Sequence, residues 1–186
     1  MNASLTQAAQ SLFAANVNLP ILATPELYGS KLVAAMDRQH PRDLFDVQYM
    51  FNRFGMPSDF LDCFVVYLAG HNRPVQEVLF AKRQPLDQVF AYEFAGMTSK
   101  PVELRQLIDT RERLFTDLPR ALTKAHRTFL LTLVQGNPDW SQMPFAHLQD
   151  LPAIRWKQFN LAKLLKTNPK RFAHQYDELA ARLDVL

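Results

Sequence analysis

The residues best suited to chemistry crowd into one stretch, PELYGSKLVAAMDRQHPRDLFD, at residues 25–46. Lysine is a compact cation that suits a triphosphate, and aspartates suit a magnesium ion that bridges phosphate oxygens. If the chain folds back at the proline in this stretch, then Lys31, Arg38, Asp43 and Asp46 can converge on one ligand. This combination points to nucleotide chemistry.

Two helices must position these side chains. Thr24 is a good N-cap for the first helix, which should stop at Gln39 or His40 because the residue before a proline is pushed out of the helical region. Pro41 opens the second helix, and Gly55 fits the position just after its end. A helix pair over 24–55 is therefore predicted.

A structural interpretation of the same charges stays open. Asp43 lies in the first turn of its helix, where a carboxylate favours the helix dipole, and Arg42 and Asp46 form an i,i+4 pair. Such contacts stabilise a protein by only about 0.3 to 1 kcal/mol each. Lys31 can lay its stem along apolar surface with its ammonium in water.

The remaining sequence has helical apolar spacing, and no segment shows the alternation and turn pairs of a β-hairpin. The fold class is therefore all-α, a multi-helix bundle in a single domain, with residues 1–23 as a lead-in, 24–55 as the helix pair and 56–186 as the bundle. Residues 58–69 are apolar nearly all round, which predicts a central helix. Further helices are expected at about 3–15, 101–117, 120–135, from 152 onward, and 169–183.

Composition excludes several classes of protein. The 186 residues are 48% hydrophobic and 21% charged, as in a packed globular protein. The amino terminus lacks the features of a secretory signal, and no stretch approaches the roughly 18 apolar residues that span a bilayer. With Cys63 as the single cysteine, a disulfide is excluded and a buried structural thiol is expected. We predict a cytoplasmic protein with no membrane partner.

Other kinds of site have little support. The five histidines lack His-x-x-x-His spacing, which argues against zinc, and His126 is expected on a solvent-facing helix surface. There is no Gly-x-Ser-x-Gly elbow and no glycine-rich phosphate loop. Trp140 and Trp156 are interpreted as core anchors. The net charge of +3 permits weak attraction to nucleic acid, but no basic run or stripe is evident.

The charged stretch resembles the third and fourth motifs of the AbiEii/AbiGii-type nucleotidyltransferases, the toxins of abortive-infection and type IV toxin-antitoxin systems. GNPDW and DLPAIRWKQFN are similar to the carboxy-terminal signature of that family, so the resemblance covers roughly residues 17–166. It implies a helical domain that follows a polymerase-β-like nucleotidyltransferase core. It also implies transfer of a nucleotide from a nucleoside triphosphate to an RNA or protein acceptor, with Mg²⁺ as cofactor and a cognate antitoxin as partner.

The resemblance assigns roles to individual residues. Lys31 would bind the triphosphate. Arg38, from its place on the same helix, and Arg42 are also expected to bind substrate. Asp43 and Asp46 would be the family's carboxylates, one of them catalytically required and acting as a base, while Arg42 would orient them. No protein residue is assigned as a metal ligand.

One departure from the family bears on activity. Family members carry a Gly-Gly or Gly-Ser turn and an Asp-x-Asp or Asp-x-Glu metal pair before the third motif, and this sequence has neither feature ahead of residue 25. Because phosphoryl transfer depends on positioning and metal charge, we expect no turnover and no tight binding of Mg²⁺ or nucleotide by this chain alone. Met1 is then expected to be an internal start or the beginning of a truncated form.

Two functional hypotheses follow. The first is the helical part of a nucleotidyltransferase that completes a nucleotide site. The second is a non-catalytic interaction module that binds an antitoxin, a homologue or RNA. Either way, we expect an exposed apolar patch where a nucleotidyltransferase core would dock, and self-association through it.

Overall fold

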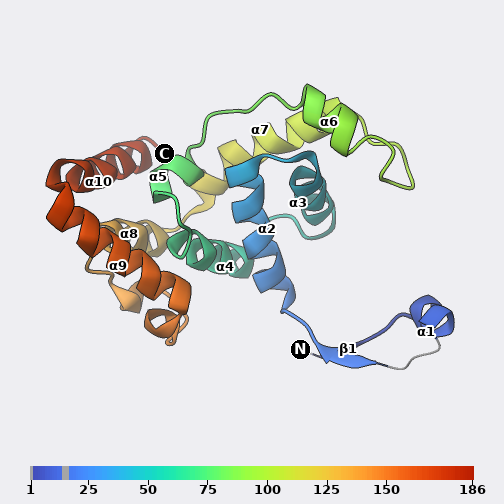
Figure 1. Cartoon of the computed structure of the whole chain (residues 1–186), viewed down its shortest axis with the longest axis horizontal. Coiled ribbons are helices and arrows are strands. Elements are labelled where there is room, and N and C mark those ends of the chain that lie inside the picture. Colours follow the sequence, from blue (N-terminus) through green and yellow to red (C-terminus); the bar gives the residue numbers. More distant parts are fainter. Residues whose placement is uncertain (1, 14–16) are drawn as a thin grey trace.

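The computed structural model describes residues 2–13 and 17–186, which form helices and one short two-stranded sheet (Figure 1). The first half contains β1 (Asn2–Ser4), α1 (Gln7–Phe13), β2 (Asn18–Pro20), α2 (Thr24–Arg38), α3 (Pro41–Phe54), α4 (Ser58–Ala69), α5 (Val75–Leu79) and α6 (Asp87–Glu93). The second half contains α7 (Leu104–Ala121), α8 (Lys124–Val134), the 3₁₀ turns η1 (Trp140–Gln142) and η2 (Leu148–Asp150), α9 (Pro152–Thr167) and α10 (Pro169–Asp184). The predicted all-α class is confirmed.

The amino-terminal arm differs from the helix expected over residues 3–15. β1 pairs antiparallel with β2, and only the segment between them is helical. Each strand has three residues, which is too short to show an alternating pattern in the sequence. The arm extends away from the helices (Figure 1), and it exposes Leu12 and Phe13 by 77% and 68%. An apolar patch where a nucleotidyltransferase core would dock, and self-association through it, both remain predictions.

The predicted central helix α4 packs along α2, and a glycine sets their distance. A Cβ added to Gly29 would lie 2.6 Å from the Cβ of Cys63 and 2.8 Å from the backbone that follows it. Only a residue without a side chain permits this approach. The backbones of α2 and α4 therefore come close together at Gly29, and Cys63 is only half-buried beside this contact.

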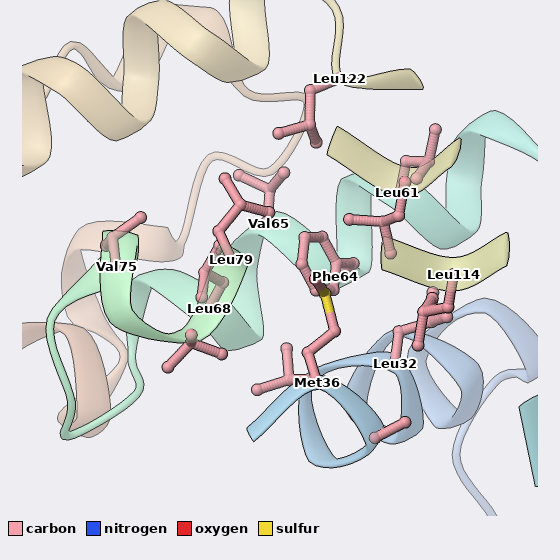
Figure 2. Packing of buried hydrophobic residues seen from close by; sticks show 14 of the residues in the cluster. Leu32, Met36, Leu61, Phe64, Val65, Leu68, Val75, Leu79, Leu114 and Leu122 are labelled. Carbon is pink, nitrogen blue, oxygen red and sulfur yellow. The ribbon is translucent and has the colours of Figure 1, made fainter. Parts of the chain in front are cut away.

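The core fills the space between α2, α4, α5 and α7 (Figure 2). Leu32 and Met36 of α2 point toward Phe64 and Leu68 of α4, and Leu114 of α7 closes the other side. All five are fully buried. Burying side chains of this size contributes roughly 1.5–3 kcal/mol each relative to leaving them exposed, so this layer fixes α2 in place.

The boundary between α7 and α8 falls later than predicted. Helix α7 continues through Pro119 to Ala121, because a proline near the end of a helix removes only one of the last hydrogen bonds. Thr123 then caps α8 by accepting from the backbone N–H of His126. The helices from Pro152 and from Pro169 begin as predicted.

His126 does not face solvent as expected. Its ring is only 3% exposed, and Nε2 lies 2.7 Å from Oδ1 of Asp62 on α4. The capping contact with Thr123 holds the ring toward α4. This tertiary partner lies 64 residues away, so helical spacing gives no sign of it.

The two tryptophans have different environments. Trp140 is partly buried against Phe129, with ring centroids 5.9 Å apart, as a core anchor should be. Trp156 is 57% exposed and stacks on Phe159 instead. The interpretation of Trp156 as a core anchor is therefore wrong, because Ile154 and Leu161 take the buried face of α9.

Candidate functional site

The turn between α2 and α3 brings the predicted site residues together. Gln39 adopts φ 52°, which ends α2, and its side chain donates to the carbonyl of Lys82 and accepts from the N–H of Gln84. The ring of His40 then caps α3 by accepting from the N–H of Arg42. This buried glutamine anchor, which sequence patterns did not reveal, fixes the angle of the helix pair.

Lys31 and Asp46 meet across the helix pair. The Lys31 Nζ lies 2.5 Å from Asp46 Oδ2, and the two side chains are 33% and 38% exposed. Both groups are therefore accessible to a ligand, although they neutralise each other.

A second ion pair lies nearer the turn. The guanidinium of Arg38 donates from Nη2 and Nε to the two carboxylate oxygens of Asp43, at 2.7 and 3.1 Å. Arg38 is 63% exposed, whereas Asp43 is only 13% exposed. We call Lys31, Arg38, Asp43 and Asp46 the hairpin face. Lys31 and Arg38 are seven residues apart and therefore lie on one side of α2. Four of the five predicted site residues thus form two ion pairs that join α2 to α3.

Arg42 does not join these residues. Its guanidinium donates to the backbone carbonyl of Glu93 at 3.1 Å, and the neighbouring His40 ring lies 3.1 Å from the Glu93 carboxylate. The i,i+4 pair expected between Arg42 and Asp46 is not formed, because Asp46 pairs with Lys31. Arg42 instead ties the start of α3 to the end of α6.

The hairpin face by itself does not fit a magnesium ion. Magnesium is held by free carboxylate oxygens, and both aspartates are already paired with a cation. Within residues 2–13 and 17–186, no three His, Cys, Asp or Glu side chains gather closely enough to hold a metal. Among the described residues, the hairpin face therefore offers cations that suit a phosphate, and it does not offer a set of metal ligands.

A groove lies beside α2, between α4 and the segment 144–154, with a volume of about 960 Å³. Its floor is apolar, and carboxylates surround it; we call it the acidic groove. Its apolar lining includes Val33, Ala34, Val66, Leu151 and Ile154, and its acidic lining comprises Glu26, Asp37, Asp59 and Asp62. Neither Lys31 nor Asp46 lines it, whereas Arg38 does, so the acidic groove adjoins the hairpin face at Arg38.

A buried lysine holds one end of the acidic groove. Lys157 of α9 donates to the carbonyls of His71 and Arg73, at 2.9 and 2.6 Å, and burial lowers its pKa to about 8. Arg73 in turn donates to Asp37 at 2.6 Å. Sequence reasoning missed Lys157, although its spacing from Ile154 places it on the buried face of its helix.

Cys63 also lines the acidic groove, and its thiol is unreactive at neutral pH. Burial, with Glu26 and Asp62 nearby, raises the pKa of the thiol to about 11. A thiol rather than a thiolate is present at neutral pH, and the thiol is a poor nucleophile. Cys63 is half-buried rather than buried as expected, and the raised pKa of its thiol is compatible with a packing role.

The comparisons with known proteins add the family. The family model described as "Nucleotidyl transferase AbiEii toxin, Type IV TA system" matches residues 2–160. Curated proteins and solved structures gave no match. In the described part of the chain, no helix is long and apolar enough to cross a membrane. A type IV toxin-antitoxin system implies an antitoxin partner. The predicted resemblance is thus confirmed, and the chain belongs to the AbiEii nucleotidyltransferase toxin family.

Proposed function

We propose that this chain is the helical portion of an AbiEii-type nucleotidyltransferase, and that Lys31 and Arg38 bind the triphosphate of a nucleoside triphosphate. One observation carries the proposal: both cations lie on a single accessible face, and each is held in place by an aspartate. Preorganised cations lose little side-chain freedom when a phosphate replaces the carboxylate. Family membership supports nucleotidyl transfer as the reaction, and we propose an RNA or a protein as the acceptor.

The aspartates have unequal roles in this proposal. When Lys31 turns to a phosphate oxygen, Asp46 loses its partner and becomes a free carboxylate on an open surface. Asp46 is then the better candidate for a base that accepts the proton of an acceptor hydroxyl. Asp43 is largely buried and grips Arg38 through both oxygens, so it acts by positioning. Arg42 also positions, because it holds α3 to α6.

Magnesium must be held by other carboxylates. It would arrive with the triphosphate and neutralise its charge. The sequence has no Asp-x-Asp pair, and Asp46 is the single hairpin-face carboxylate that binding of the triphosphate would free, since Asp43 keeps both of its contacts with Arg38. We therefore propose that nucleotide transfer requires a nucleotidyltransferase core that supplies paired carboxylates, and that this chain alone does not turn over.

The test is a thermal shift assay with each of the four nucleoside triphosphates and Mg²⁺. We expect a nucleotide to raise the melting temperature, and Lys31→Ala to abolish that rise, because binding to the folded state stabilises it. Asp46→Asn should increase the rise, since Lys31 then has no competing carboxylate. Lys124→Ala is the matched control, because it removes an exposed lysine from α8. No rise with any nucleotide, or an equal rise in Lys31→Ala, would refute the proposal.

The acidic groove favours a second candidate function, an interaction module. An apolar floor bordered by carboxylates on a chain of net charge +3 fits a basic amphipathic segment of an antitoxin better than it fits RNA or a second copy. Val66→Trp would fill the groove from α4, and it leaves unchanged the helix α2 that carries Lys31 and Arg38. We expect this variant to lose the cognate antitoxin in co-purification while it keeps the nucleotide-induced rise in melting temperature. Retention of the antitoxin would exclude the groove.

A further inference from the structure

One face of α9 carries exposed aromatic rings and cations in register. Trp156, Phe159, Lys163 and Lys166 follow one another at intervals of three and four residues, so they lie on one side of the helix. We call these four residues the α9 face. Ile154, Lys157 and Leu161 are buried on the opposite side.

The aromatic pair is already arranged as a flat platform. Trp156 and Phe159 are 57% and 60% exposed, their ring centroids lie 5.6 Å apart, and their planes differ by 18°. Large aromatic side chains exposed together are costly in water. A ligand with flat apolar faces would cover them.

The cations around the platform have no counter-charge. Residues 151–176 contain six of the chain's 21 Lys and Arg and none of its 18 Asp and Glu. The rest of the chain therefore has three more acids than bases, so the positive charge of the protein is concentrated here. Lys163, Lys166 and Lys170 form no ion pair with any described residue. Their ammonium groups are available to a polyanion.

We propose that the α9 face, extended by Lys170, binds single-stranded RNA. Bases would stack on Trp156 and Phe159 while the lysines contact the phosphates, which is how proteins hold single strands without reading their sequence. Cells present unpaired bases chiefly in loops and ends of RNA, whereas DNA is mostly paired. The proposal rests on the α9 face alone and does not require the proposed nucleotide site.

The α9 face lies far from the hairpin face. Figure 1 shows α9 and α10 at one end of the molecule and α3 and α6 at the other. An RNA strand on α9 would therefore leave Lys31 and Asp46 open. Nucleotide binding and RNA binding can be measured separately on the same protein.

The test is fluorescence anisotropy of a labelled oligouridylate of about 12 nucleotides titrated with the protein. Lys163→Glu/Lys166→Glu should weaken binding about tenfold or more, because two phosphate contacts become repulsive. The matched control is Lys82→Glu/Lys124→Glu, which makes the same change in net charge on exposed lysines elsewhere. An equal loss in the control would overturn the proposal, since it would mean that only net charge matters.

The proposed stacking of bases on Trp156 and Phe159 is tested with a separate variant and a separate measurement. Trp156→Ala/Phe159→Ala should weaken binding by about five- to 100-fold, and Tyr92→Ala, which removes a ring that is 87% exposed on α6, should not. In a Trp140→Phe protein, Trp156 is the sole tryptophan, and RNA should quench its emission. Unchanged affinity in the double alanine variant would overturn the proposal. So would tighter binding to oligothymidylate, to duplex RNA or to vesicles of anionic lipid.

Discussion

The hairpin face and the α9 face each present cations to solvent, yet the charges on the two surfaces are organised in opposite ways. Lys31 and Arg38 are each matched by an aspartate, whereas Lys163 and Lys166 have no such partner in the described part of the chain. An anion must displace a carboxylate from the hairpin face, so only a ligand with the right geometry and charge should bind there. The α9 face should attract any strand of phosphates with accessible bases. The two surfaces therefore differ in selectivity because the cations of one are paired with aspartates and those of the other are not.

The largest effect should come from the residue that positions the hairpin face. Gly29→Ala should lower the free energy of unfolding by about 1 to 3 kcal/mol, because the new Cβ would overlap Cys63 and its backbone. Urea denaturation measures this loss, with the neighbouring Ser30→Ala as the control. RNA affinity should be unchanged where the variant remains folded. A variant as stable as the parent would show that α2 and α4 can separate without cost.

The next largest effect should be that of salt on RNA binding to the α9 face. With three lysines on phosphates, raising salt from about 50 to about 200 mM should weaken RNA binding about 20-fold, because counterion release gives a slope near −0.7 per contact. Anisotropy titrations at several salt concentrations measure the slope. A salt-independent affinity would contradict phosphate contacts on α9.

A change in pH should reveal how the buried Lys157, which joins α9 to the end of the acidic groove, affects the stability of the protein. The pKa of Lys157 is about 8 in the folded protein and about 10.5 when unfolded, so between these values the unfolded chain binds more protons. The free energy of unfolding should therefore rise by about 1 kcal/mol from pH 8 to pH 9 through this residue. Chemical denaturation at both pH values measures it. The rise should be absent in Lys157→Met, and an equal rise in both proteins would assign it elsewhere.

The smallest effect should be the stability that the Lys31–Asp46 pair provides. Both side chains are about one-third exposed, so solvent screens the pair, and Asp46→Ala should cost less than about 1 kcal/mol of unfolding free energy. A double-mutant cycle with Lys31→Ala measures the coupling. If Asp46→Ala instead loses cooperative melting, then Asp46 is a structural residue and the hairpin face is a brace for α2 and α3.

The predictions from sequence were most accurate where the signals were local. Proline at the start of α3, α9 and α10 and the glycine after α3 placed those boundaries correctly. The convergence of Lys31 with Asp46 followed from the turn before Pro41. Where a residue's partner lay far along the chain, the predictions were wrong, as for His126 with Asp62 and for Arg42 with the backbone of Glu93.

The amino-acid sequence by itself determined the helical class, the helix pair and its family, because caps, breakers and apolar spacing act within a few residues. Only the tertiary structure decided which charges are neutralised. Coulomb attraction depends on distance in space and not on distance along the chain. Asp46 therefore pairs with Lys31, although Arg42 is nearer to it in the sequence. Packing likewise left Trp156 in solvent and buried Lys157, although the two are adjacent in the sequence. A helix turns by about 100° per residue, so neighbours on the chain face different surroundings.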